Sequence, residues 1–494
     1  MTVDIYETIN NNIYNFPKKL PYITVSSKGI SNGLSTIIND GADFGPDTLL
    51  GTSSKNRYGP PYSQTSGIQE AINYCQATGA NHIHLNKGIY IINWNDTFTK
   101  QQYAIGIPSL PNGLSITGEG GGNLGMPFVL ASNSPYGSGG SVYTTLNGTI
   151  IYFNFPNTSF TNTYTTYPVF GLYVLPSPDI YDNKSITQVF IDNVDFSSNL
   201  LQAKYGWVVA DFENASSLQI GHTNIWTDLP QATYLGPTPP TPSTFYFTIG
   251  LITPSTPTIG MPGHVQIYVS GFQTGIVING SHQSILNLFI QACNNAIELS
   301  PFVHTAIINY LAVSMVQYVI YFTPPNSSYE TGIIINDLDT EIGSNLSIPL
   351  KALIYNPQNA YIQGKIRIHN VNNGLTLSEL GTIPNGMEIE FNGVTTDVVN
   401  NLFQQTVNGT TAGSVFVNQL KYSTYYKKVM FVFNDYENDT TTNQTISYPM
   451  PFNTIASITS NTTNLTITAS TSGITITSPN STATYNGIVI VEGY

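Results

Sequence analysis

The stretch that decides the fold begins Asn39-Asp40-Gly41-Ala42-Asp43-Phe44-Gly45-Pro46-Asp47-Thr48 and continues to Gly120. Its glycines and its proline exclude a regular helix or strand at the start, so residues 39–48 are expected to form turns. The elements that come after these turns determine which fold they introduce.

A short helix is expected next. Ser66 can accept a hydrogen bond from the backbone N–H of Gln69 while the glutamine side chain reaches back, which is the pattern of a capping box. Gly79 stands where helices often end on a left-handed residue. Between these ends the apolar residues recur at i, i+4 and i+7, at Ile68, Ile72 and Cys75. One apolar stripe of the helix should therefore face a large partner.

Two short strands joined by a turn follow the helix. Residues 82–85 alternate polar and apolar side chains, residues 86–88 form a glycine turn, and residues 89–92 are a second strand. Residues 114–120 then lead from a third strand into a Gly-Glu-Gly turn. This order resembles the start of the pectate-lyase superfamily of right-handed parallel β-helices, apart from a longer insertion at residues 49–64.

That superfamily includes polysaccharide hydrolases and lyases, and also the tailspikes of many viruses. The resemblance implies an all-β chain built as a right-handed single-stranded parallel β-helix with an N-terminal capping helix. Because one fold hosts many unrelated activities, it implies a fold and leaves the function to be argued from other residues.

A repeat in the middle of the chain supports the same fold. The pattern of residues 275–280 recurs at residues 296–301 and again at residues 319–324, which gives spacings of 21 and 23 residues. A period of this size is typical of a solenoid, whose coils bury their apolar side only when they stack. Under this register three isoleucines point inward, whereas three neighbours stack outward: Val277, Glu298 and Tyr321.

The pattern is interrupted twice. The segment from Pro230 to Pro262 is rich in proline and threonine and is expected to be a loop outside the ladder. After residue 395 short alternating strands with polar turns predict a small antiparallel β-sandwich, preceded by a short helix from Asp397 to Phe403. The expected organisation is an N-terminal arm or cap (1–38), a parallel β-helix (39–395) and a C-terminal β-sandwich (396–494).

The composition is unusual for a chain of 494 residues. Charged residues make up 9%, compared with about 25% in average globular proteins. The formal net charge of −13 gives no electrostatic support to nucleic-acid binding. A surface with so few charges changes little on acidification, which favours a hot, acidic, extracellular habitat; ordinary β-rich composition is the alternative.

The location is inferred from signals that are missing. The first residues show no basic n-region and no apolar h-region, so no signal peptide is recognisable, and no stretch reaches the ~18 apolar residues of a membrane span. Many Asn-X-Ser/Thr sequons favour an exterior protein, although a chain rich in these residues shows several by chance. A virion surface protein satisfies both signals. Cys75 and Cys293 are expected to be buried free thiols.

Cleavage of a glycosidic bond needs two carboxylates beside it. The best candidates for catalytic acids share one face of an extended segment: Asp337, Asp339 and Glu341. Other candidates are Asp192 with Asp195, Asp211 with Glu213, and Glu298. Solvated surface acids are the alternative for each cluster. The polygalacturonase-type enzymes of this fold carry a paired Asp-Asp that is missing here, and no lyase motif surrounds either arginine, so family catalytic residues are not carried over.

Outward aromatic residues next to amides predict carbohydrate binding, because sugar rings have apolar CH faces and hydroxyls that need partners. The candidate glycan-binding residues are Tyr268, Phe289, Tyr310, Tyr321 and Glu298. Packing under loops or against a second subunit is the alternative for the aromatics. No cofactor or metal is expected, because His82 and His84 give only half a metal site.

Two functions remain open. The favoured one is a virion surface spike or adhesin, forming a homotrimer or joining other virion proteins, that binds a polysaccharide or cell-surface glycan. The rival is a polysaccharide hydrolase or lyase that uses the acids on the outer face of the β-helix.

Overall fold

The computed structural model describes twenty-one segments of the chain, which are residues 22–28, 40–55, 57, 60–93, 103–119, 148–154, 169–176, 187–198, 207–227, 248–255, 263–280, 282–301, 303–341, 350–372, 383–392, 414–422, 426–437, 444–448, 452–462, 465–477 and 484–494. They belong to two compact units. The first contains residues 1–202 and 209–225, and the second contains residues 203–208 and 226–494. The expected short helix at 397–403 lies outside the described residues.

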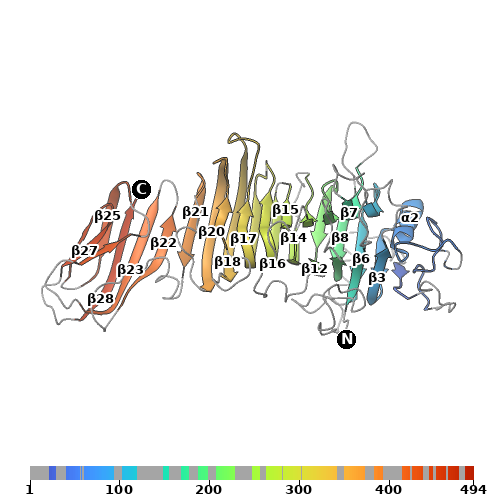
Figure 1. Cartoon of the computed structure of the whole chain (residues 1–494), viewed down its shortest axis with the longest axis horizontal. Coiled ribbons are helices and arrows are strands. Elements are labelled where there is room, and N and C mark those ends of the chain that lie inside the picture. The colour runs from blue at the N-terminus through green and yellow to red at the C-terminus, as the bar shows by residue number, and fades with distance from the viewer. Residues whose placement is uncertain are drawn as a thin grey trace, which may run out of the picture. The chain divides into compact units, whose positions relative to one another are not determined.

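The described residues of the first unit form one helix and a series of short strands (Figure 1). They are α2 (Ile68–Thr78), β1 (Ile23–Val25), β2 (His82–Leu85), β3 (Gly88–Asn93), β4 (Tyr103–Ile107), β5 (Leu114–Gly118), β6 (Thr149–Asn154), β7 (Val169–Val174), β8 (Gln188–Asp192), β9 (Val194–Ser198) and β11 (Ser217–Ile220). Two further strands, β10 (Trp207–Asp211) and β12 (His222–Thr227), have residues in both units.

The pairing of these strands defines a β-helix with three strands per coil. Each strand pairs in parallel with the strand three elements further on: β2 with β5, β5 with β8, β8 with β11, β3 with β6, β6 with β9, and β4 with β7. Strand β1 adds to the start of the first sheet through Ile23 opposite Ile83. A strand from the segment expected to be an arm or cap therefore extends the first face.

The helix closes this unit as the sequence predicts, although its start differs. Ile68, Ile72 and Cys75 are fully buried, and Gly79 has φ 76° with its N–H bonded to the carbonyl of Cys75. The predicted capping box is wrong. Gly67 is the N-cap with φ 85°, and a Cβ there would lie 2.5 Å from the backbone N of Gly45.

The two residues of the predicted capping box bind β-strands instead. Ser66 Oγ donates to the carbonyl of Ile91 at 2.8 Å. The Gln69 amide donates to the carbonyl of Gly106 at 3.1 Å and accepts from its N–H at 2.8 Å. The N–H of Gln69, in the first turn of the helix, instead donates to Oγ1 of Thr65, one residue before the expected cap. Tertiary contacts to the strands thus took precedence over the local cap.

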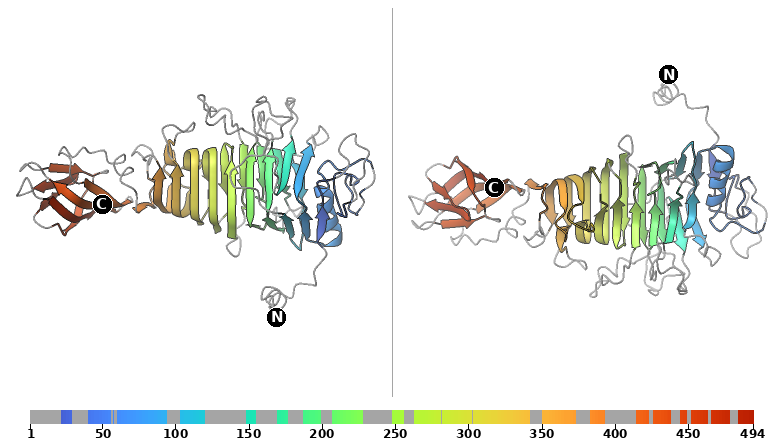
Figure 2. Two further views of the ribbon diagram at one scale, coloured as in Figure 1. Left: turned by 90° about the horizontal axis from the view of Figure 1, so that it is seen from below. Right: turned by 90° about the horizontal axis from the view of Figure 1, so that it is seen from above.

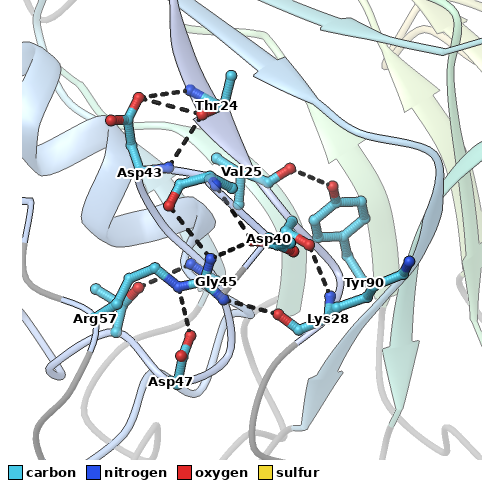
Figure 3. A network of polar contacts seen from close by, with 12 residues as sticks. Thr24, Val25, Lys28, Asp40, Asp43, Gly45, Asp47, Arg57 and Tyr90 are labelled. Atoms are coloured by element: carbon cyan, nitrogen blue, oxygen red, sulfur yellow. Dashed lines mark hydrogen bonds and ion pairs between the residues drawn. The ribbon is translucent and has the colours of Figure 1, made fainter. Parts of the chain in front are cut away.

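A buried arginine fixes the turn-rich start (Figure 3). Arg57 is 5% exposed and donates to Asp47 at 2.7 Å, to Asp40 at 2.6 Å and to the carbonyl of Lys28 at 2.9 Å. Burial alone would raise the pKa of Asp40, but hydrogen bonds from Ser26 and Arg57 lower it below its ordinary value. The insertion at 49–64 therefore supplies the cation that holds three segments together.

The second unit also contains parallel β-helix coils, and its strands are longer. They are β13 (Thr248–Ile252), β14 (Gly263–Ser270), β15 (Thr274–Ile278), β16 (Gln283–Leu299), β17 (Ala306–Tyr321), β18 (Glu330–Glu341), β19 (Ala352–Tyr355), β20 (Tyr361–Asn372) and β21 (Met387–Asn392). Figure 2 shows the strands between residues 263 and 372, coloured yellow to orange, side by side.

The predicted period is confirmed strand by strand. Ile276 lies opposite Ile297, and Ile297 lies opposite Ile320, so the coils are 21 and 23 residues long. All three isoleucines are fully buried. Stacking identical apolar side chains in register buries the face that one coil alone leaves in water.

The long strands β16 and β17 each turn a corner at a residue with positive φ. Ala292 and Met315 both have φ 54°, and they lie one coil apart. The backbone on either side of this corner faces in different directions, which divides the outer surface of these coils into two faces. This corner decides which of the predicted site residues come together.

The prediction that residues 230–262 stand outside the ladder is wrong for part of that segment. Strand β13 pairs in parallel with β15 through Leu251 opposite Ile276. The apolar run from Ile249 to Ile252 carries this strand, although proline and threonine dominate the composition around it.

The C-terminal module contains two antiparallel sheets. Strands β22 (Ser414–Tyr422), β23 (Lys427–Glu437), β28 (Thr484–Gly493) and β25 (Ile455–Ser460) pair in that order. Strands β24 (Gln444–Ser447), β27 (Gly473–Thr477) and β26 (Thr466–Ala469) form the second sheet. Phe431 of the first sheet and the buried residues Tyr448 and Phe452 pack as an aromatic core. The predicted all-β architecture, a parallel β-helix followed by an antiparallel module, is confirmed.

Candidate functional site

The outer surface of the coils before the corner forms what we call the aromatic face. It consists of the outward side chains of β14, of β16 from 283 to 291, of β17 from 306 to 314, and of β18. Parallel pairing places Tyr268 opposite Phe289, Phe289 opposite Ala312, and Ala312 opposite Asp339. Adjacent strands lie about 4.8 Å apart, so these positions form a column across four coils.

A second column runs beside the first. Gln266 lies opposite Asn287, which lies opposite Tyr310. The two columns touch, because the rings of Phe289 and Tyr310 meet edge to face with centroids 5.7 Å apart. Three of the predicted glycan-binding residues are thereby brought onto one surface: Tyr268, Phe289 and Tyr310.

Hydrogen bonds orient the two tyrosines. The Tyr268 hydroxyl donates to Gln291 Oε1 at 2.9 Å, and the Tyr310 hydroxyl donates to Asp339 Oδ2 at 3.2 Å. The pKa of Tyr310 is raised by partial burial and by the carboxylates of Asp339 and Asp337. Burial also raises the pKa of Tyr268, so both phenols are protonated at neutral and acidic pH.

Apolar side chains border the columns. Val265 and Leu286 are 37% and 48% exposed, which is high for large hydrophobic residues. Each immediately precedes an outward amide, Gln266 or Asn287. The aromatic face thus combines exposed apolar carbon with amides and hydroxyls, the mixture that a sugar ring requires.

The predicted acids lie at one side of this face. Asp337 and Asp339 are half-buried on β18, and Asp339 is already an acceptor for Tyr310. The backbone of Glu341, two residues after Asp339, lies opposite Ser314; its side chain lies outside the described residues. The register of β18 shifts around Leu338, so the spacing of these acids is not that of a regular strand. In this position Asp337 and Asp339 can accept hydrogen bonds from a ligand bound on the aromatic face.

The remaining two predicted glycan-binding residues lie on the other side of the corner. Glu298 lies opposite Val277 on one side and opposite Tyr321 on the other. Glu298 is largely buried, which raises the pKa of its carboxyl despite a hydrogen bond from Thr274 at 3.2 Å. The five predicted residues therefore divide between two surfaces.

Two further tyrosines on that second face were missed by the sequence analysis. The ring of Tyr321 stacks on that of Tyr355 with centroids 5.1 Å apart, and Tyr318 lies 4.7 Å from Tyr355. Tyr318 is three residues before Tyr321 in the same strand. Tyr355 belongs to a coil whose spacing departs from 21 or 23 residues, so the period did not find it.

The other candidate acids have structural roles. The carboxylate of Asp195 is fully buried and accepts from the N–H and the amide of Asn224 at 3.0 and 2.9 Å. Asp211 is 2% exposed, its carboxylate accepts from the N–H of Glu213, and burial raises its pKa to about 7. Asp192 accepts from the N–H of His222 at 2.9 Å. Two of these contacts join strand β12 to β8 and β9, and the contact of Asp211 is local.

The histidine pair near the start is held by a shared hydroxyl. His82 Nε2 and His84 Nδ1 lie 2.9 and 3.0 Å from Thr117 Oγ1, and burial together with His84 lowers the pKa of His82. Within the described segments, no group of three or more His, Cys, Asp or Glu side chains is arranged to hold a metal ion. Cys75 and Cys293 are buried free thiols, as expected.

Comparisons with known proteins add little to this geometry. No family model matches the chain, and no curated protein matches it. Among solved structures, the chain is similar to the Pseudomonas phage phi297 tailspike gp61 at 9% identity over 87% of this chain and 92% of that one, with a TM-score of 0.14. A TM-score this low carries no argument, so the class is defined by the chain's own structure: a parallel β-helix protein with an antiparallel C-terminal module.

A search of the described helices for a membrane span gives a negative result. Helix α2 has 11 residues, and no described helix is long and apolar enough to cross a bilayer.

Proposed function

We propose that this protein is a surface spike of a virus particle that binds glycans on a cell or environmental surface through the aromatic face. The observation that carries the proposal is the ladder of Tyr268, Phe289 and Tyr310 across successive coils, with oriented hydroxyls and flanking amides. Aromatic rings stack on the CH faces of sugars, while amides and carboxylates take up the sugar hydroxyls.

The spacing of the ladder supports an extended saccharide as the ligand. Strands repeat every 4.8 Å or so along the coil axis, and this is close to the length of one pyranose unit in an extended chain. A glycan lying along the coil axis then places successive rings over successive coils. The side chains of Asp337 and Asp339 add acceptors without adding a cation, which favours a neutral or amino sugar there.

The wider setting is proposed on the same grounds. The low charge content favours a virion protein in a hot, acidic habitat, and an attached antiparallel module favours assembly into a homotrimer. Membership of the pectate-lyase superfamily, as a tailspike-like member, is part of this proposal. Its supports are the resemblance of residues 39–120 and the three-strand coil of the first unit.

Binding of purified protein to a panel of immobilised neutral polysaccharides tests the function. We expect Tyr310→Ala to weaken binding to a neutral ligand about tenfold or more, because a stacked ring contributes ~1–3 kcal/mol in comparable stacking sites. Tyr62→Ala is the matched control, since Tyr62 is 39% exposed and belongs to the other unit. Equal loss in both variants, or no binding to any glycan, would reject the proposal.

The rival function, glycan cleavage, has one observation in its favour. Asp337 and Asp339 share a strand on the same face as the aromatic ladder, and Asp339 receives a phenol hydrogen bond. A cleaving enzyme would release new reducing ends or unsaturated sugars from a bound polysaccharide. Release that is abolished in both Asp337→Asn and Asp339→Asn would favour the enzyme over the spike.

A further inference from the structure

A second group of side chains, which we call the tyrosine–lysine cluster, lies beyond the corner in the coils. It consists of Tyr318, Tyr321, Tyr355 and Lys351. The three rings are 4.7, 5.1 and 5.9 Å apart between centroids, and Lys351 Nζ lies 6.0 Å from the centre of the Tyr318 ring. The tyrosines are half-buried and Lys351 is exposed.

The rings of this cluster are arranged differently from those of the aromatic face. Tyr321 and Tyr355 are opposite each other in parallel strands, and their planes differ by only 12°. Each ring therefore covers a face of the other, which leaves the ring edges and the phenol O–H donors for a ligand. The Tyr321 oxygen also accepts a hydrogen bond from Thr323. A row of phenol O–H groups donates hydrogen bonds, whereas an open ring face would stack on a sugar.

The charge of the cluster distinguishes it further. Lys351 makes no ion pair with the described residues, in contrast to Lys55, which pairs with Asp43 at 2.8 Å, and Lys365, which pairs with Glu388 at 3.3 Å. An exposed cation next to three tyrosines, whose hydroxyls can donate hydrogen bonds, suits an anionic ligand. The aromatic face, with Asp337 and Asp339, has the opposite sign.

We propose that the tyrosine–lysine cluster is a second ligand site, selective for an acidic sugar whose carboxylate or sulfate group is bound by Lys351 and the tyrosine hydroxyls. It rests on the proposed function only in that the ligand is a carbohydrate. Glu298, one coil before Tyr321, opposes the ligand electrostatically and tunes the affinity. The protein thus presents two sites of different selectivity on adjoining faces of the same coils.

Three probes that share a lactose core test this site: lactose, sialyllactose and a sulfated lactose, measured by titration calorimetry on the full chain. We expect the two acidic probes to bind at least tenfold more tightly than lactose at low salt, with the difference shrinking as salt screens the charge. Lys351→Gln should remove about tenfold of affinity for the acidic probes and leave lactose unchanged. Binding of only one acidic probe identifies the anionic group as carboxylate or sulfate.

The matched control for charge is Lys55→Gln, because Lys55 also lies over a tyrosine ring, 5.5 Å from the centre of Tyr74, and is paired. This variant should bind the acidic probes normally. Tyr355→Phe keeps the ring stack and removes one hydroxyl, so it should weaken acidic probes alone. Glu298→Gln should strengthen them, an effect that a damaged fold would not produce.

Several outcomes would overturn the second site. They are equal binding of lactose and the acidic probes by the native chain, unchanged binding in Lys351→Gln, or loss of acidic binding in Tyr310→Ala instead. A change of oligomeric state in Tyr355→Phe, measured by analytical ultracentrifugation, would make the cluster a subunit contact and also reject the proposal. The proposed glycan binding by the aromatic face is tested independently, by the binding of neutral polysaccharides to the native chain and to Tyr310→Ala.

Discussion

Replacing Asp211 by Asn should make the folded state more stable at high pH and leave it nearly unchanged in acid. Asp211 is 2% exposed, and burial raises the pKa of its carboxyl from 3.8 to about 7, with the charge of Glu213 adding to the effect. An acid whose pKa is higher in the folded state binds its proton more tightly there. Its contribution is therefore fully present below pH 3.8 and is lost as pH rises to about 7.

The size of the effect follows from the same pKa values. Each pKa unit corresponds to ~1.36 kcal/mol, so ionising Asp211 in the folded state costs about 4 kcal/mol above pH 7. Asn keeps the oxygen that accepts from the N–H of Glu213, at 2.7 Å in the native protein, and cannot ionise. Asp211→Asn should therefore gain several kcal/mol at pH 8 and close to nothing at pH 4.

Equilibrium urea unfolding of both proteins at pH 4, 6 and 8 measures this difference. His264 acts in the opposite sense, since burial lowers its pKa to about 4 and the folded state loses stability as pH falls from 6.5 to 4; this contribution is common to both proteins and cancels. Glu213→Gln, an exposed change of the same charge, should gain little. A pH-independent difference between native and Asp211→Asn proteins would refute the reasoning.

Two further predictions concern the fold. Arg57→Ala should lower the free energy of unfolding by about 3–5 kcal/mol, because it leaves Asp40 and Asp47 without their buried cation. Arg367→Ala, at a side chain that is 38% exposed, should lower it by under about 1 kcal/mol. Equal losses of the two variants in urea unfolding would contradict this prediction. Gly364→Ala should prevent stable folding of its coil, because Gly364 has φ 148° and a Cβ would lie 1.7 Å from the carbonyl oxygen of Ile333. Gly263→Ala is the control, since a Cβ there meets open space. This control should have the circular dichroism spectrum and melting temperature of the native protein.

The local patterns in the chain predicted the repeating parts of the fold well. The alternation around Ile276, Ile297 and Ile320 predicted both the register and the direction of each side chain, because in a strand the side-chain period is two and every coil repeats the last. The apolar stripe of the helix and the glycine at its end were equally local properties. The capping box failed because Ser66 and Gln69 found partners on strands that are distant in sequence.

The candidate site was predicted only as a list of outward residues. Alternation marks Tyr268, Phe289, Tyr310 and Tyr321 as outward within their own runs, but it does not tell on which side of a corner each run lies. The alternation also changes phase at the corner, since Ile290 before it and Ile297 after it are both buried. The corner lies at Ala292, which has a positive φ. Alanine has no preference for positive φ, so the sequence does not predict a corner there.

By itself, then, the sequence determined a parallel β-helix with a capping helix and an antiparallel end, since these depend on periodicity and turn residues that each segment carries alone. Only the tertiary structure decided which outward residues share a surface. It separated Tyr310 and Asp339 from Tyr321 and Glu298, and it brought Tyr355 and Lys351 to the latter pair. The physical reason is that a surface is made by neighbouring coils, whose lengths and corners are fixed by packing over the whole stack.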